Sequence, residues 1–132
     1  MATESRVNGA PTVGASRRIV LVEDNDDLRD LFRILLEHRG HYVKEARDGI
    51  EGLSHIPAEK PDLAIVDIGL RGMDGYEVAR QVRSALGHTV LLVAMTGYVQ
   101  ESDRLEALAA GFDTHVTKPF DIGIVERLLD TQ

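Results

Sequence analysis

The chain has 132 residues, of which 43% are hydrophobic, enough for one domain with a buried core but too few for two ordinary domains. Its net charge of -7 argues against a direct nucleic-acid surface, because binding to phosphates needs clustered Lys and Arg. It has no cysteine, no apolar run near the roughly 20 residues that span a bilayer and no secretory signal, so we expect a cytoplasmic protein without membrane contact.

Residues 1–16 are rich in Gly, Ala, Ser and Thr and show no hydrophobic periodicity. We therefore expect a flexible leader over residues 1–16, followed by one domain over residues 17–132.

From Arg18 onward, short apolar runs alternate with longer amphipathic segments. In chain order, the patterns first predict a strand at 19–22 and a helix that ends near Gly40 and carries Leu28, Leu31, Phe32, Leu35 and Leu36. A strand at 42–46 and a helix at 49–56 follow, and then a loop bracketed by Pro57 and Pro61. The remaining segments predict strands at 63–66, 90–95 and 114–118, each followed by a helix, at 74–86, 100–110 and 121–129. Five strands that alternate with five helices predict a doubly wound α/β fold, in which helices cover both faces of a parallel sheet.

Polar side chains follow four of these strands. Glu23 and Asp24 follow the first strand, Asp67 the third, Thr96 the fourth, and Lys118 ends the fifth. In an open α/β sheet, ligands bind beyond the carboxyl ends of the strands. The sequence therefore predicts that three carboxylates, a hydroxyl and an ammonium group meet at one edge of the sheet.

The predicted cluster carries an excess of negative charge. Two like charges about 4 Å apart repel by about 4 kcal/mol at an effective dielectric constant of 20, and Lys118 supplies a single positive charge. A hard divalent cation with oxygen ligands would complete the balance, and Mg²⁺ fits this description best. Such a site suits phosphoryl transfer, with the Asp67 carboxylate as the covalent acceptor.

The segments "VLVEDNDDLRDL", "LAIVDIGLRGMDGYEVAR", "MTGY" and "AGFDTHVTKPF" resemble the receiver domain of two-component response regulators. The resemblance extends over most of the chain. It implies a flavodoxin-like (βα)5 fold with strand order 2-1-3-4-5. It also implies that Mg²⁺ is held by Glu23, Asp24, Asp67 and the backbone carbonyl of Gly69.

The same resemblance implies a role for each remaining polar residue of the cluster. Asp67 would be the phosphoacceptor, Thr96 and Lys118 would bind the phosphoryl group, Gly97 would leave room for it, and the bond before Pro119 would be cis. The donor would be a sensor histidine kinase or a histidine phosphotransfer protein. A downstream protein target would bind the face formed by the fourth helix, the fifth strand and the fifth helix, and the domain would catalyse only its own phosphorylation and dephosphorylation.

Two positions depart from the family pattern. The family often has proline after the leucine of the acceptor loop, whereas this chain has Arg71 after Leu70. The family often has Tyr or Phe three residues before the lysine, as a side chain that switches rotamer together with the hydroxyl residue. This chain has His115 there, so Thr96 and His115 are the candidate switch pair.

Several alternatives remain open at this point. Glu23 and Asp24 could favour the start of the first helix instead of binding metal, although Asn25 or Asp26 could cap that helix. A metal-dependent phosphohydrolase also uses an Asp nucleophile at a strand end, but it needs a second Asp two residues later, where this chain has Gly69.

A module that docks without phosphorylation would be expected to lack an acid or the lysine of the cluster, and none is missing. The chain could also be a receiver cut from a hybrid histidine kinase or from a longer regulator. The five histidines are scattered, so we expect most of them at the surface and do not expect a zinc site.

Overall fold

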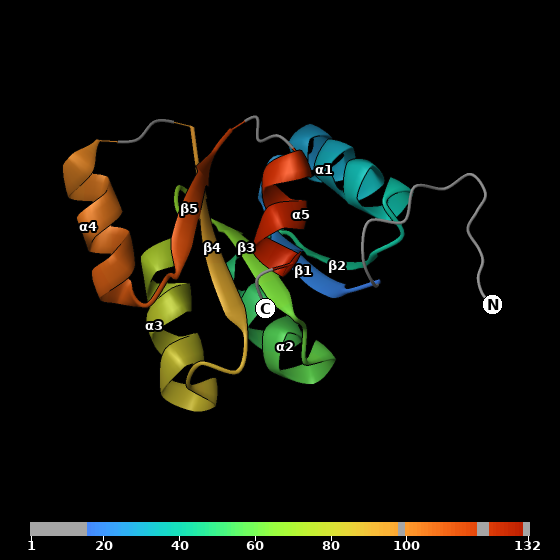
Figure 1. Ribbon diagram of the computed structural model, residues 1–132. Coiled ribbons are helices and arrows are strands. Elements are labelled where there is room, and N and C mark those ends of the chain that lie inside the picture. Colours follow the sequence, from blue (N-terminus) through green and yellow to red (C-terminus); the bar gives the residue numbers. More distant parts are fainter. Residues whose placement is uncertain (1–15, 98–99, 119–121, 131–132) are drawn as a thin grey trace.

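The computed structural model describes residues 16–97, 100–118 and 122–130. The strands are β1 (Arg18–Val22), β2 (Tyr42–Ala46), β3 (Leu63–Asp67), β4 (Leu91–Thr96) and β5 (Thr114–Thr117), and the helices are α1 (Asp26–His38), α2 (Gly49–Glu59), α3 (Gly75–Leu86), α4 (Glu101–Ala110) and α5 (Ile122–Asp130). All strand pairs are parallel, in the order β2-β1-β3-β4-β5 (Figure 1). The predicted fold class and strand order are confirmed.

The core consists of two layers, one on each face of the sheet. Val20 and Val22 of β1 face the layer that contains residues of α2, α3 and α4. Ile19 and Leu21 face the opposite layer, which contains residues of α1 and α5. All five residues of β3 are buried, as expected for a central strand covered on both faces. Figure 1 shows the same division, with α1 and α5 on one side of the sheet.

The strand register aligns the residues that carry the polar cluster. Val22 pairs with Val66, so Glu23 and Asp67 follow at the same level of the sheet. Thr96 pairs with Thr117, which brings Lys118 next to the end of β4. β3 and β4 each run one residue further than predicted, so Asp67 and Thr96 are the last residues of their strands.

The predicted loop at Pro57 is wrong, because α2 continues through Pro57 to Glu59. Proline cannot donate to the carbonyl four residues earlier, but Pro57 lies close to the end of the helix, where few such bonds remain to be lost. Ile56 is fully buried, and its packing favours continuation of the helix. Lys60 ends it with a left-handed backbone (φ 49°) and donates its N–H to the Ile56 carbonyl at 3.2 Å.

His41 is an exception to the expectation of surface histidines, because it is buried. Its Nδ1 accepts the backbone N–H of Arg17 at 3.1 Å, and its Nε2 lies 2.7 Å from Glu126 Oε2 of α5. Since Nδ1 accepts, Nε2 carries the proton and donates to the Glu126 carboxylate. The pair joins α5 to the start of β2.

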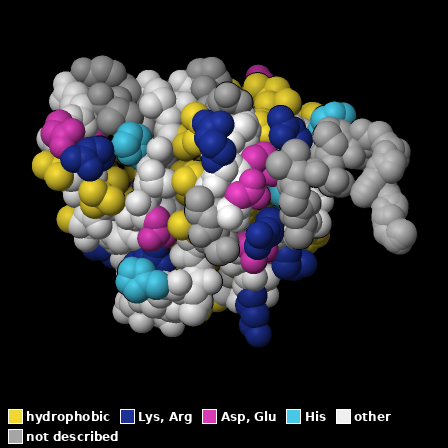
Figure 2. All heavy atoms as spheres, in the orientation of Figure 1, with side chains coloured by type: hydrophobic (Ala, Val, Ile, Leu, Met, Phe, Trp, Pro, Cys, Tyr) yellow, Lys and Arg dark blue, Asp and Glu magenta, His cyan; other side chains and the backbone are white. Residues whose placement is uncertain are grey.

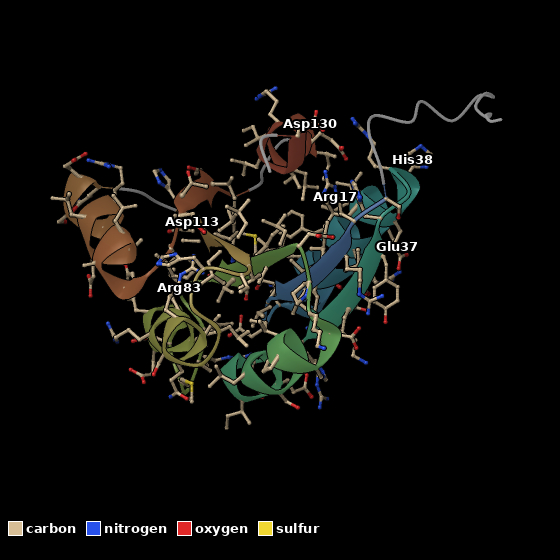
Figure 3. The ribbon with its side chains drawn as sticks, turned by 60° about the horizontal axis from the view of Figure 1, so that its bottom comes forward. Arg17, Glu37, His38, Arg83, Asp113 and Asp130 are labelled. Atoms are coloured by element: carbon tan, nitrogen blue, oxygen red, sulfur yellow. The ribbon has the colours of Figure 1, made fainter. Side chains whose placement is uncertain are left out.

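Arg83 of α3 links several elements at the end of the sheet that lies opposite the polar cluster. Its guanidinium donates to Asp113 Oδ2 at 2.6 Å, to the Gly111 carbonyl at 2.7 Å and to the Val90 carbonyl at 2.8 Å. Figure 3 shows Arg83 and Asp113 side by side. Asp113 also accepts the Leu92 N–H at 2.8 Å, so one ion pair holds α3, the end of α4 and β4 together.

The predicted leader lies outside the described residues, except for Ser16, whose hydroxyl donates to the Gly40 carbonyl at 2.6 Å. Within the described part of the chain, no helix is both long enough and apolar enough to cross a bilayer.

Candidate functional site

Three carboxylates meet at the carboxyl end of the sheet. Asp67 ends β3 and is 5% exposed, Glu23 follows β1 and is fully buried, and Asp24 comes next in the chain. Each residue offers one oxygen, and these oxygens lie within 4.8 Å of one another. The predicted convergence of the acids is therefore present.

Lys118 lies between two of these acids. Its Nζ donates to Asp67 Oδ2 at 2.9 Å and lies 2.8 Å from Glu23 Oε1. The backbone places it there, because the Lys118 N–H donates to the Thr96 carbonyl at 2.7 Å and so extends the pairing of β4 and β5. The other oxygen of Asp67, Oδ1, accepts the Gly69 N–H at 2.9 Å. Both oxygens of Asp67 are thus held.

The surroundings of Glu23 disfavour the ionised form of its carboxyl group. Burial raises its pKa above the ordinary value, and the negative charge of Asp67 acts in the same direction. The contact with Lys118 and the Asn25 N–H, which Oε2 accepts at 2.9 Å, oppose this shift without cancelling it. The Lys118 ammonium, 2.8 Å from Glu23 Oε1, therefore helps to stabilise the ionised form of this buried carboxyl.

Asn25, not Glu23 or Asp24, is the N-cap of α1. Its side-chain oxygen accepts the Leu28 N–H at 3.0 Å. Glu23 contacts this helix start through Oε2, which accepts the Asn25 N–H at 2.9 Å, while its Oε1 lies beside Lys118.

Arg29 of α1 supports the acid pair, and sequence reasoning missed this. Its side chain is buried, and Nη1 donates to the Glu23 carbonyl at 2.9 Å. It also binds Asp26 at 2.7 Å and Glu45 at 3.2 Å. The available signal was the spacing of Asp26 and Arg29 by three residues, which places both on one helix face.

Asp24 differs from Glu23 because it has a cationic partner of its own. Arg71 donates to Asp24 Oδ2 through its backbone N–H at 3.1 Å and through Nε at 3.3 Å. Partial burial acts to raise the pKa of Asp24, but the hydrogen bonds and positive charge of Arg71 outweigh it, so the pKa lies below the ordinary value.

Lys118 remains charged in this setting. Burial acts to lower its pKa, but the contacts with Glu23 and Asp67 outweigh burial, so the pKa lies above the ordinary value. The centre of the site therefore combines three carboxylates with one ammonium group.

The donor set fits a hard divalent cation. Mg²⁺ takes oxygen ligands at about 2.0–2.1 Å in octahedral geometry, which places neighbouring and opposite ligand oxygens about 3 to 4 Å apart, within the span of the three acids. Lys118 supplies a single positive charge to these carboxylates, so such a cation would also offset the remaining negative charge.

Thr96 and His115 both line one small hollow between β4, β5 and α4, together with Ala107. Thr96 is 8% exposed, and His115 of β5 pairs with Ala94 in the strand register and is half-buried. A Cβ at Gly97 would meet no atom within 4 Å. The predicted cis peptide before Pro119 lies outside the described residues.

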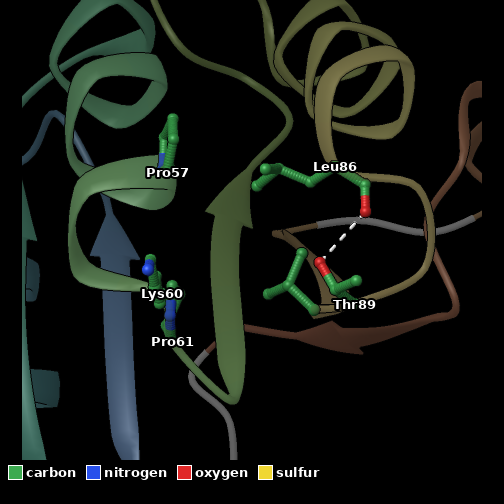
Figure 4. Close-up of a pocket in the computed structure, with 6 residues that line it drawn as sticks. Pro57, Lys60, Pro61, Leu86 and Thr89 are labelled. Atoms are coloured by element: carbon green, nitrogen blue, oxygen red, sulfur yellow. Dashed lines mark hydrogen bonds between the residues drawn. The ribbon is translucent and has the colours of Figure 1, made fainter.

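A separate cavity of about 260 Å³ lies at the opposite end of the sheet, between the ends of α2 and α3 (Figure 4). Its lining includes Pro57, Pro61, Leu86 and Val90, with Lys60 and Thr89. This lining offers no carboxylate, so the cavity does not take part in the acid chemistry.

The sequence matches the family model of the response regulator receiver domain over residues 19–129. The chain is 40% identical over 108 residues to an uncharacterized 14.6 kDa protein of Leptolyngbya boryana, covering 81% of this chain and 82% of that protein. It is 36% identical over 103 residues to the transcriptional regulatory protein CseB of Streptomyces coelicolor, covering 78% of this chain and 43% of CseB. The chain thus spans less than half the length of that regulator.

Solved structures give the same result. The receiver domain of a sensor histidine kinase from Pseudomonas aeruginosa, with a magnesium ion coordinated in its active site cleft, is similar with a TM-score of 0.79 and 30% identity, covering 89% of this chain and 97% of that chain. A LuxR-family two-component response regulator from Aurantimonas is similar with a TM-score of 0.81 and 30% identity, covering 89% and 88%. Fold, family model and relatives agree, and the chain belongs to the response regulator receiver domain family of two-component systems.

Proposed function

We propose that this receiver domain accepts a phosphoryl group on Asp67 from a histidine kinase or a histidine phosphotransfer protein. The main support is the setting of the Asp67 carboxylate, which ends the central strand and is held by Lys118 Nζ and the Gly69 N–H, both at 2.9 Å. Two further carboxylates lie beside it. An aspartate that only formed a turn would not need an ammonium group and two further carboxylates beside it.

In the proposed reaction, one carboxylate oxygen of Asp67 attacks the donor's phosphorus atom. The bond from phosphorus to the donor's leaving atom breaks, the leaving group keeps the electron pair, and a mixed anhydride forms on Asp67. The Lys118 ammonium neutralises charge on the phosphoryl oxygens, and the Thr96 hydroxyl binds the same group. Gly97 leaves space beside it, since the structure has no atom where a Cβ would lie.

Glu23, Asp24, Asp67 and the Gly69 carbonyl would hold Mg²⁺, which when bound neutralises charge on the transferring group. The fit of three carboxylates to oxygen-preferring cations supports this assignment. The magnesium ion in the active site cleft of the related receiver from Pseudomonas aeruginosa supports it further.

We assign the output surface to α4, β5 and α5. Leu105 and Leu108 of α4 are 54% and 43% exposed, and Figure 2 shows hydrophobic side chains gathered over α4. Phosphorylation would shift Thr96 and His115 behind this surface and so change its affinity for a downstream protein target. As a two-component domain spanning residues 17–132, it would meet kinase and target in the cytoplasm.

Hydrolysis of external substrates is a poorer match to the site. A phosphohydrolase of this type needs an acid two residues after the nucleophile, and Gly69 provides only backbone there. The domain would therefore catalyse its own phosphorylation and dephosphorylation only.

The test is intact-mass analysis of the full chain after incubation with acetyl phosphate and Mg²⁺. Wild type should gain one phosphoryl group, and both Asp67→Asn and wild type with excess chelator should gain none. Asp30→Asn, which changes an exposed acid on α1, serves as the matched control and should label like wild type. Efficient labelling of Asp67→Asn would refute the assignment.

A further inference from the structure

Arg71 is bound to the acid cluster in an unusual way. Its backbone N–H and its Nε both donate to the same atom, Asp24 Oδ2, at 3.1 and 3.3 Å. Its side chain is nevertheless 85% exposed, so the guanidinium contributes little to packing. The contact is electrostatic, and Asp24 is one of the three acids available to a metal ion.

The neighbouring residues fix the backbone at Arg71 and leave its side chain free to rotate. Leu70 is buried in the core on one side, and Gly72 makes a turn with φ 80° on the other. The backbone N–H is therefore held near Asp24 by the loop itself. The guanidinium can leave Asp24 by side-chain rotation alone, without disturbing the core.

Resting on the proposed function, we propose that Arg71 is a resident counter-ion of Asp24 that Mg²⁺ must displace. A magnesium ion at about 2.0–2.1 Å from an Asp24 oxygen would lie within about 5 Å of a guanidinium still bound to that carboxylate, and the two positive charges would repel. The free domain therefore keeps Asp24 neutralised, and metal binding exchanges one cation for another. Arg71 sets the metal affinity of the phosphorylation site.

The structure provides room for the displaced side chain. An open cleft of about 600 Å³ lies beside the acids, lined by Asp24, Asp26, Arg47, Asp48, Arg71 and Gly72. Two of its carboxylates, Asp26 and Asp48, offer the released guanidinium a new electrostatic environment. Arg47 lines the same cleft but pairs with Glu51 at 2.8 Å, not with an acid of the metal cluster.

The experiment measures the Mg²⁺ dissociation constant of the unphosphorylated full chain by NMR titration, following the Gly69 amide. Arg71→Gln should bind Mg²⁺ about two- to fivefold more tightly than wild type, as expected for the loss of one exposed ion pair. Arg71→Lys keeps the charge and should stay close to wild type. The gain in Arg71→Gln should shrink at high ionic strength, because exposed charges are screened.

Arg47→Gln is the matched control, since it removes the same charge from the same cleft. It should change the Mg²⁺ affinity far less than Arg71→Gln does. Equal affinities of wild type and Arg71→Gln, or equal gains in Arg71→Gln and Arg47→Gln, would overturn the counter-ion role while leaving the metal site intact. If neither wild type nor any variant binds Mg²⁺, the metal assignment of the proposed function fails as well.

Discussion

Gly75, the first residue of α3, lies so close to the end of β3 that any side chain would collide with backbone. A Cβ at this position would be 2.6 Å from both the Asp67 carbonyl oxygen and Ile68 Cα. These atoms cannot rotate away as a side chain would. In Gly75→Ala, either α3 or the segment after Asp67 must therefore move, and Asp67 would shift relative to Lys118.

The expected loss of stability follows from two opposing contributions. Overpacking costs about 1–3 kcal/mol, whereas the better helix propensity of Ala returns at most about 1 kcal/mol, and less at the first helical position. We expect Gly75→Ala to lower the free energy of unfolding by about 1–2 kcal/mol. For a domain of this size, that corresponds to a fall in Tm of roughly 4–10 °C.

Urea denaturation followed by circular dichroism measures this change, and Gly97→Ala is the control. A Cβ at Gly97 would meet no atom within 4 Å, so its free energy of unfolding should stay within about 0.5 kcal/mol of wild type. Acetyl phosphate labelling of Gly75→Ala should also slow, because the acceptor is displaced. A Gly75→Ala protein as stable as wild type would refute the close approach of α3 to β3.

Three further predictions concern single charges and the hydroxyl. Arg47 lowers the pKa of Glu51 to about 2 through hydrogen bonds from its side chain and its backbone N–H, so this pair stabilises the fold above pH 4.5 and loses its effect as pH falls toward 2. Glu51→Gln should therefore be less stable than wild type by about 0.5–1 kcal/mol at pH 7, a small value because solvent screens this exposed pair. The difference in stability should disappear in acid, and a difference that persists at low pH would contradict the predicted pH dependence. Burial raises the pKa of Glu23 above its ordinary value of 4.5, so ionisation of Glu23 opposes folding, and stability without metal should fall as pH rises from 4.5 through the raised pKa. Denaturation of Glu23→Gln at a series of pH values above 4.5 should show a weaker decline in stability than wild type, and an unchanged pH profile would count against this reasoning. Thr96→Ala should still accept phosphate but show smaller NMR shift changes over α4, β5 and α5; equal changes in both proteins would remove Thr96 as the coupling residue.

The alternation of elements and the position of the acids were predictable because they follow from local patterns. Apolar runs of strand length marked the sheet, and the carboxyl-end rule then placed Glu23, Asp67 and Lys118 together. The predicted bounds of β2 agree with the structure, and no bound of the other four strands differs by more than one residue, which is the usual uncertainty of strand ends.

The remaining features depend on tertiary contacts that leave no local signal. His41 and Glu126 pair across the fold, and nothing in either segment indicates the other. The packing of Ile56 outweighs the tendency of Pro57 to end a helix. The contact between Arg71 and Asp24 depends on the path of a loop, although the replacement of the family's usual proline by Arg71 was visible in the sequence.

The most direct test of the central claim locates the phosphoryl group on the chain. An aspartyl phosphate is a mixed anhydride, so borohydride reduces it to an alcohol with release of phosphate and leaves homoserine at the acceptor position. After labelling with acetyl phosphate and Mg²⁺, followed by reduction, tandem mass spectrometry should find homoserine at position 67 alone. Homoserine at position 24, or no reducible acidic residue in a labelled protein, would contradict the assignment of Asp67 as the phosphoacceptor.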